Sequence, residues 1–153
     1  MSMVTRWTWI AAGLAVLAAV APARAQKAKP RIEDIVGDYK VKFDEIANNC
    51  TQTGMSLRKG VVTLAIDRKG NRKRWFSVSI PIAPVMFGSE PRDGKFRVRA
   101  PRAGTGIRGV LGEFNASGRA ASGVIQFVYI AEFFTKDGKP LCTQSWNVSG
   151  VKQ

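Results

Sequence analysis

The chain has 153 residues, with 24 Lys or Arg, 11 Asp or Glu and no His, so its net charge is +13. The absence of histidine removes the commonest general base, the commonest metal ligand and the usual pH switch, which argues against an enzyme. The positive charge favours acidic partners such as anionic polymers, lipid surfaces or acidic proteins.

The first 25 residues have the pattern of a cleaved export signal. Arg6 supplies a positive charge, residues 10–20 form an apolar run, and Ala23-Arg24-Ala25 matches a small-x-small cleavage site. The run is too short to cross a bilayer with a hydrocarbon core of ~30 Å. We therefore expect a protein that is secreted or exported to the bacterial periplasm, without a transmembrane segment in its mature form. Cleavage would leave 22 basic and 11 acidic side chains, a net charge of +11.

The residues after the signal fit the size of one domain. Residues 26–36 form a cationic leader that ends in a short helical turn, because Pro30 precedes residues 31–36 and acidic side chains lie near the start of the turn. Residues 37–153 are expected to form one β domain, because apolar residues recur there with a period of two.

Several segments alternate apolar and polar residues, as half-buried strands do. Tyr39, Val41 and Phe43 share one face of the first segment, and Phe96 and Val98 share one face of a later segment. Strands are expected over residues 38–44, 60–67, 75–80, 82–87, 95–99, 107–114, 122–134 and 142–149. Residues 45–59 fit either a loop or a short strand.

Turn sequences with Gly and Asn or Asp separate several of these segments, at 68–71, 91–94 and 136–139. Short strands, local turns and little helix predict an all-β fold. We expect a small antiparallel up-and-down barrel of about eight strands, with a β-sandwich as the alternative. The expected shape resembles lipocalin-like small secreted barrels. No motif specific to that family is present, so the resemblance assigns no binding residue.

Cys50 and Cys142 are the only cysteines, so one intramolecular pairing is available. Outside the cytosol the pair can oxidise, and we expect a disulfide that ties the last strand near the first. On the last strand, Gln144 and Trp146 lie on the same side as Cys142. These two residues are candidates to line a cavity inside the barrel, although simple packing around the disulfide is the favoured interpretation.

Two basic segments form a candidate anion-binding surface. Guanidinium groups bind phosphate or sulfate oxygens through paired hydrogen bonds, and an indole can stack on a ring or lie at a lipid headgroup. The alternative is an ordinary solvated face of a basic protein. The candidate residues are Arg68, Lys69, Arg72, Lys73, Arg74, Trp75, Lys95, Arg97, Arg99 and Arg102.

Residues 124–134 are apolar on both faces of a predicted strand. Ile125, Phe127 and Tyr129 fall on one face, and Val128 and Ile130 fall on the other. Both faces of such a strand must be covered, either by other parts of the chain or by a partner. We expect the N-terminal helical turn to cover the outer face, with a protein partner or a second copy of the chain as the alternative.

These features favour an exported, non-enzymatic binding protein whose basic outer surface contacts an anionic envelope component or acidic macromolecule. The alternatives are a carrier of a small apolar ligand inside the barrel and a protein-interaction or inhibitor module built on residues 124–134. We assign no catalytic residue, metal ligand or cofactor, because no nucleophile elbow, phosphate-binding loop or Asp-rich loop is present. Sequence-specific nucleic-acid binding is not expected, because the motifs of that function are missing.

Overall fold

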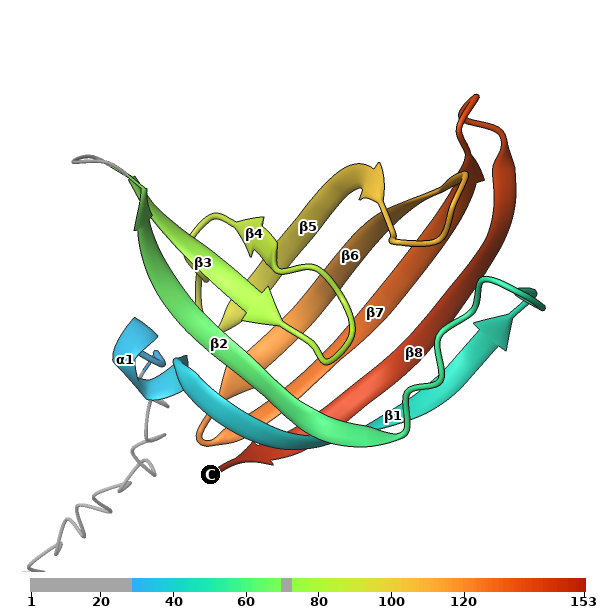
Figure 1. Cartoon of the computed structure of the whole chain (residues 1–153). Coiled ribbons are helices and arrows are strands. Elements are labelled where there is room, and N and C mark those ends of the chain that lie inside the picture. The colour runs from blue at the N-terminus through green and yellow to red at the C-terminus, as the bar shows by residue number, and fades with distance from the viewer. Residues whose placement is uncertain (1–28, 70–72) are drawn as a thin grey trace, which may run out of the picture.

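The computed structural model describes residues 29–69 and 73–153, which form a closed antiparallel barrel (Figure 1). Each strand pairs with the next along the chain, and the last strand pairs with the first. This confirms the up-and-down barrel and rules out the sandwich. The elements are α1 Ile32–Ile35, β1 Gly37–Asn48, β2 Lys59–Lys69, β3 Lys73–Ser79, β4 Met86–Gly88, β5 Lys95–Gly104, β6 Val110–Ala121, β7 Val124–Thr135 and β8 Pro140–Lys152. The predicted export signal (1–25) and the leader before residue 29 lie outside the described residues.

The two ends of the barrel differ. Figure 1 places α1 and the C-terminus at one end, and the connection between β7 and β8 at the other. We call the second end the mouth. The strand order places four connections there, at residues 49–58, 80–85, 105–109 and 136–139.

Large side chains from every wall fill the barrel below the mouth. Trp146 and Tyr129 are fully buried and stack with ring centroids 5.4 Å apart, and Phe114 stacks on the other side of Tyr129 at 6.4 Å. Burial of a large apolar side chain stabilises a fold by about 1.5–3 kcal/mol. These rings therefore form a solid floor for the mouth.

Small residues of β6 make room for this packing. Gly118 pairs with Phe96 on one neighbouring strand and with Phe127 on the other. Because Gly118 carries no side chain, the two phenyl rings meet above it, with centroids 5.8 Å apart. A Cβ at residue 118 would overlap the Gln126 carbonyl oxygen and the Phe127 Cβ. The predicted set of strands missed residues 115–121, because Ala, Ser and Gly have little β propensity by themselves.

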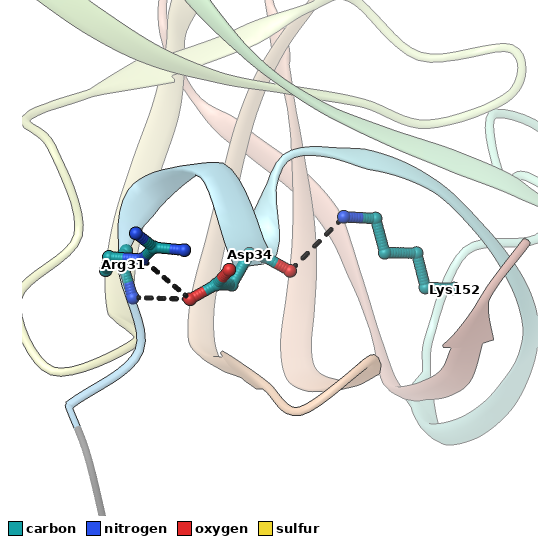
Figure 2. Close-up of polar contacts among 3 residues, drawn as sticks. All are labelled: Arg31, Asp34 and Lys152. Carbon is teal, nitrogen blue, oxygen red and sulfur yellow. Dashed lines mark hydrogen bonds and ion pairs between the residues drawn. The ribbon is translucent and has the colours of Figure 1, made fainter.

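Helix α1 closes the end opposite the mouth. Ile35 is 1% exposed and joins the core, while the Tyr39 hydroxyl donates a hydrogen bond of 2.8 Å to the Ile35 carbonyl. Figure 2 shows the Asp34 carboxylate accepting a bond from the Arg31 N–H, and Lys152 donating to the Asp34 carbonyl. The helical turn was predicted correctly, but it packs into the barrel end and not onto the outer face of β7.

Two strand predictions need correction near the mouth. Residues 82–85 leave the sheet, because Pro81 and Pro84 have no N–H for a ladder bond and Ile82 has φ +58°. Residues 107–109 belong to a turn in which the Val110 N–H donates to the Ile107 carbonyl. By contrast, residues 45–48 continue β1 and pair with β8.

Replacement of Gly118 by alanine tests the packing above β6. We expect Gly118→Ala to lower the free energy of unfolding by about 2–3 kcal/mol, because the new methyl group overlaps its neighbours. Gly104→Ala is the matched control: a Cβ there meets nothing within 4 Å, so the change should stay below about 0.5 kcal/mol. Urea unfolding monitored by circular dichroism measures both values, and equal losses would contradict the packing account.

Candidate functional site

An open cavity of about 780 Å³ occupies the mouth of the barrel. Its lining is mostly apolar and comes from strands and connections that are far apart in the sequence. Thr53, Ser56 and Thr105 supply the few polar side chains. The apolar lining includes Met55, Ile82, Ala83, Pro84, Val85, Phe87, Ala100, Pro101, Ala103, Ile107, Phe114 and Phe133.

The disulfide holds one wall of this cavity. Cys50 and Cys142 are bonded, which confirms the predicted pairing and fixes the connection 49–58 to the start of β8. Gln144 holds the same connection through two hydrogen bonds. Its Oε1 accepts a hydrogen bond of 2.6 Å from the Met55 N–H, and its Nε2 donates one of 3.1 Å to the Met55 carbonyl. The Thr53 hydroxyl lies 2.9 Å from the Cys142 sulfur. The connection is therefore a fixed wall.

Gln144 and Trp146 were predicted as candidate cavity-lining residues. Gln144 is 1% exposed and Trp146 is fully buried, and neither belongs to the lining of the mouth cavity. Gln144 holds the wall, and Trp146 forms part of the floor through its stack with Tyr129. Direct contact of either side chain with a ligand stays a prediction.

Tyr129 has an unusual environment within the floor. Among the side chains that the structure describes, its hydroxyl is the buried polar group without a hydrogen-bond partner. Burial raises the pKa of the Tyr129 phenol, and the pKa of Tyr39 is raised for the same reason. Both phenols are therefore neutral at physiological pH, and Tyr129 acts as an aromatic packing surface.

A second hollow of about 580 Å³ lies on the outside of the barrel. We call it the outer groove. Trp75 of β3 and Arg97 and Arg99 of β5 line it together, so the indole of the first predicted basic segment lies beside two arginines of the second. Arg99 lies 3.5 Å from Glu113, whereas Arg97 has no ion-pair partner within the described ranges. The outer groove can therefore present a cation beside an indole.

The outer groove also contains part of the doubly apolar strand. Val128 and Ile130 of β7 line it and are half-buried, while Val124 is 51% exposed. Glu132 lines the same groove and is directly opposite Glu113 on the neighbouring strand. The groove thus combines apolar, cationic and acidic side chains. An interaction of residues 124–134 with a protein stays a prediction.

The remaining members of the predicted basic surface lie elsewhere. Arg74 points away from Trp75, forms an ion pair of 2.6 Å with Glu90, and borders a separate small pocket beside α1. Lys95 is exposed at the start of β5. Arg102 lies over the ring of Phe134. The backbone of Arg68, Lys69 and Lys73 lies in β2 and β3, and Arg72 falls outside the described residues.

A ligand inside the barrel was one of the predicted alternatives, but the residues that line the mouth cavity were not predicted, because they come from connections and strands that carry no recognisable motif. A weak signal was present in the run Ile80-Pro81-Ile82-Ala83-Pro84-Val85, where prolines interrupt an apolar segment. Such a segment cannot lie inside a central strand and must place its apolar side chains elsewhere. Phe87, on the short strand β4, borders both the mouth cavity and the outer groove.

No protein-family model, curated protein or solved structure matches this chain. Among the described residues, none of the helical segments has the length and hydropathy that a membrane-spanning helix needs. The same residues contain no cluster of three or more metal-ligating side chains. Functional inference therefore rests on the geometry of the mouth cavity and the outer groove.

Proposed function

We propose that the protein binds a small apolar or amphiphilic ligand in the mouth of its barrel. The observation that carries this proposal is the cavity of about 780 Å³ with its largely apolar lining. Ligand pockets typically measure about 300–1,000 Å³, are mostly apolar with a few polar groups, and often lie in the mouths of β-barrels. The proposed role is to bind and carry this ligand after the protein has been exported. Export itself is predicted by the signal pattern of residues 1–25.

The construction of the walls supports this proposal. A pocket binds more tightly when its walls need not be ordered by the ligand. Here the disulfide and the two bonds of Gln144 fix one wall, and the stack of Trp146, Tyr129 and Phe114 forms the floor. The ligand would enter at the mouth and rest on Phe114 and Phe133.

Filling the cavity tests the proposal. In the chain without residues 1–25, we expect Ala103→Phe to weaken binding of 1-anilinonaphthalene-8-sulfonate at least about tenfold, because the new ring occupies ligand space. The titration follows dye fluorescence in 1 M NaCl, which screens attraction to basic surfaces. Ala121→Phe, at the opposite end of β6, is the control and should leave affinity unchanged. Equal weakening by both variants, or no dye binding at all, would refute the proposal.

We infer as a second candidate that the outer groove binds an anionic polymer or acidic macromolecule. The shared lining by Trp75, Arg97 and Arg99 favours this function, because guanidinium groups can pair with sulfate or phosphate oxygens while the indole stacks on a ring. Contact with an anionic envelope component would use this face.

Salt dependence and charge variants test the second candidate. We expect binding to a heparin-like polysaccharide to weaken steeply as salt rises, since ion release drives such association. The pair Arg97→Ala and Arg99→Ala should reduce affinity, and Glu132→Gln should increase it by removing a repulsive charge. Lys40→Ala with Lys59→Ala, on β1 and β2, is the control for net charge. Equal loss in the control pair would assign binding to net charge alone.

A further inference from the structure

The two ends of the barrel differ in charge. The four connections at the mouth contain four basic side chains, Arg58, Arg108, Lys136 and Lys139, against one acidic side chain, Asp137. At the other end, the described connections, which exclude residues 70–72, are 29–36, 89–94 and 122–123, and they contain three basic and four acidic side chains. The side chains of Arg58 and Arg108 have no ion-pair partner in the part of the chain that the structure describes. Among the connections that the structure describes, those at the mouth therefore carry the larger net positive charge.

Apolar side chains project from the same end. Ile82 is 74% exposed, Ile107 is 46% exposed and Val85 is 41% exposed, and all three border the mouth cavity. Ile82 also has φ +58°, a backbone conformation that is rare for a β-branched residue and costs about 1–3 kcal/mol. Leu141, at the start of β8, is a further exposed residue at this end. Exposed side chains such as these contribute less to the stability of the fold in water than buried ones do.

We propose that the mouth docks on the surface of an anionic phospholipid bilayer. Ile82 and Ile107 would enter the headgroup region, while Arg58 and Arg108 would lie against lipid phosphates. Exposed apolar tips together with basic side chains are the combination that binds a membrane interface, and each basic residue near an anionic leaflet adds to the attraction. This inference builds on the proposed ligand cavity, because docking would open the cavity directly onto the lipid from which an amphiphile is taken or to which it is delivered.

Charge reversal at each end tests the orientation. The chain without residues 1–25 keeps every described contact and is the protein for the assay. We expect it to co-sediment with vesicles of phosphatidylglycerol and phosphatidylcholine, and far less with phosphatidylcholine alone. Arg58→Glu with Arg108→Glu should weaken this binding at least about 30-fold. Arg92→Glu with Arg119→Glu changes the net charge equally at the α1 end and should have little effect.

A fluorescent reporter tests the depth of contact. Ile107→Trp places an indole at the mouth, and Val151→Trp places one on the exposed outer face of β8. With Trp75→Phe in both, emission from residue 107 should shift to shorter wavelength on anionic vesicles, while emission from residue 151 should not change. A shift only at residue 151 would assign docking to the wall of the barrel and overturn the inference.

The remaining outcomes separate docking from the cavity. If both charge-reversed pairs lose the same vesicle affinity, the net charge of the protein explains vesicle binding. That result would overturn the inference. Dye binding without vesicle binding would also overturn it and leave the proposed function intact. Mouth-dependent vesicle binding without dye binding would support docking and refute the ligand cavity. If the protein self-associates and Ile82→Asn abolishes the association, the exposed apolar side chains at the mouth contact a second copy of the chain. That result would also overturn the inference.

Discussion

The bond between Cys50 and Cys142 is the constraint on which the mouth of the barrel depends. It closes a loop of 92 residues, which in the chain-entropy model stabilises the fold by about 4–5 kcal/mol. Its structural effect is local: it holds the connection 49–58 against β8, where Gln144 satisfies both backbone groups of Met55. Without the disulfide and these hydrogen bonds, the connection would become ordered only when the ligand binds. The free-energy cost of ordering it would then weaken the affinity for the ligand.

The barrel is solid at one end and hollow at the other because large and small residues are distributed unequally. Near the α1 end, Gly118 of β6 pairs with Phe96 and Phe127 of the neighbouring strands, Ala120 is buried opposite Ile125, and Ile35 of α1 closes the core. Near the mouth, Gly112 leaves room for the ring of Phe114, and the small side chains of Ala100 and Ala103 line a cavity that stays open. An ordinary core would fill such a space, because interiors pack to the density of organic crystals.

Much of the architecture could be predicted from local pattern. Period two in Tyr39, Val41 and Phe43 identified β1, and the two cysteines identified the disulfide. Local pattern did not predict the structure where packing between distant segments determines it. Residues 115–121 form a strand because Phe96 and Phe127 pack over Gly118, which no local signal records. Trp75, Arg97 and Arg99 line the outer groove together, whereas Arg74 lies on the other face because neighbouring residues of a strand point in opposite directions. The lining of the mouth cavity was not predicted, because three connections and four strands that are distant in sequence build it together.

The most direct test of the account is to locate a bound amphiphile on the barrel. We expect titration of the ¹⁵N-labelled chain without residues 1–25 with decanoate to shift amide resonances around the mouth, at residues 53–56, 82–85 and 103–107 and near Phe114 and Phe133. Resonances of Trp75 and Arg97 on the outer groove should stay in place. Shifts confined to the outer groove, or spread over the whole surface without a maximum at the mouth, would contradict the claim that this end of the barrel is the binding site.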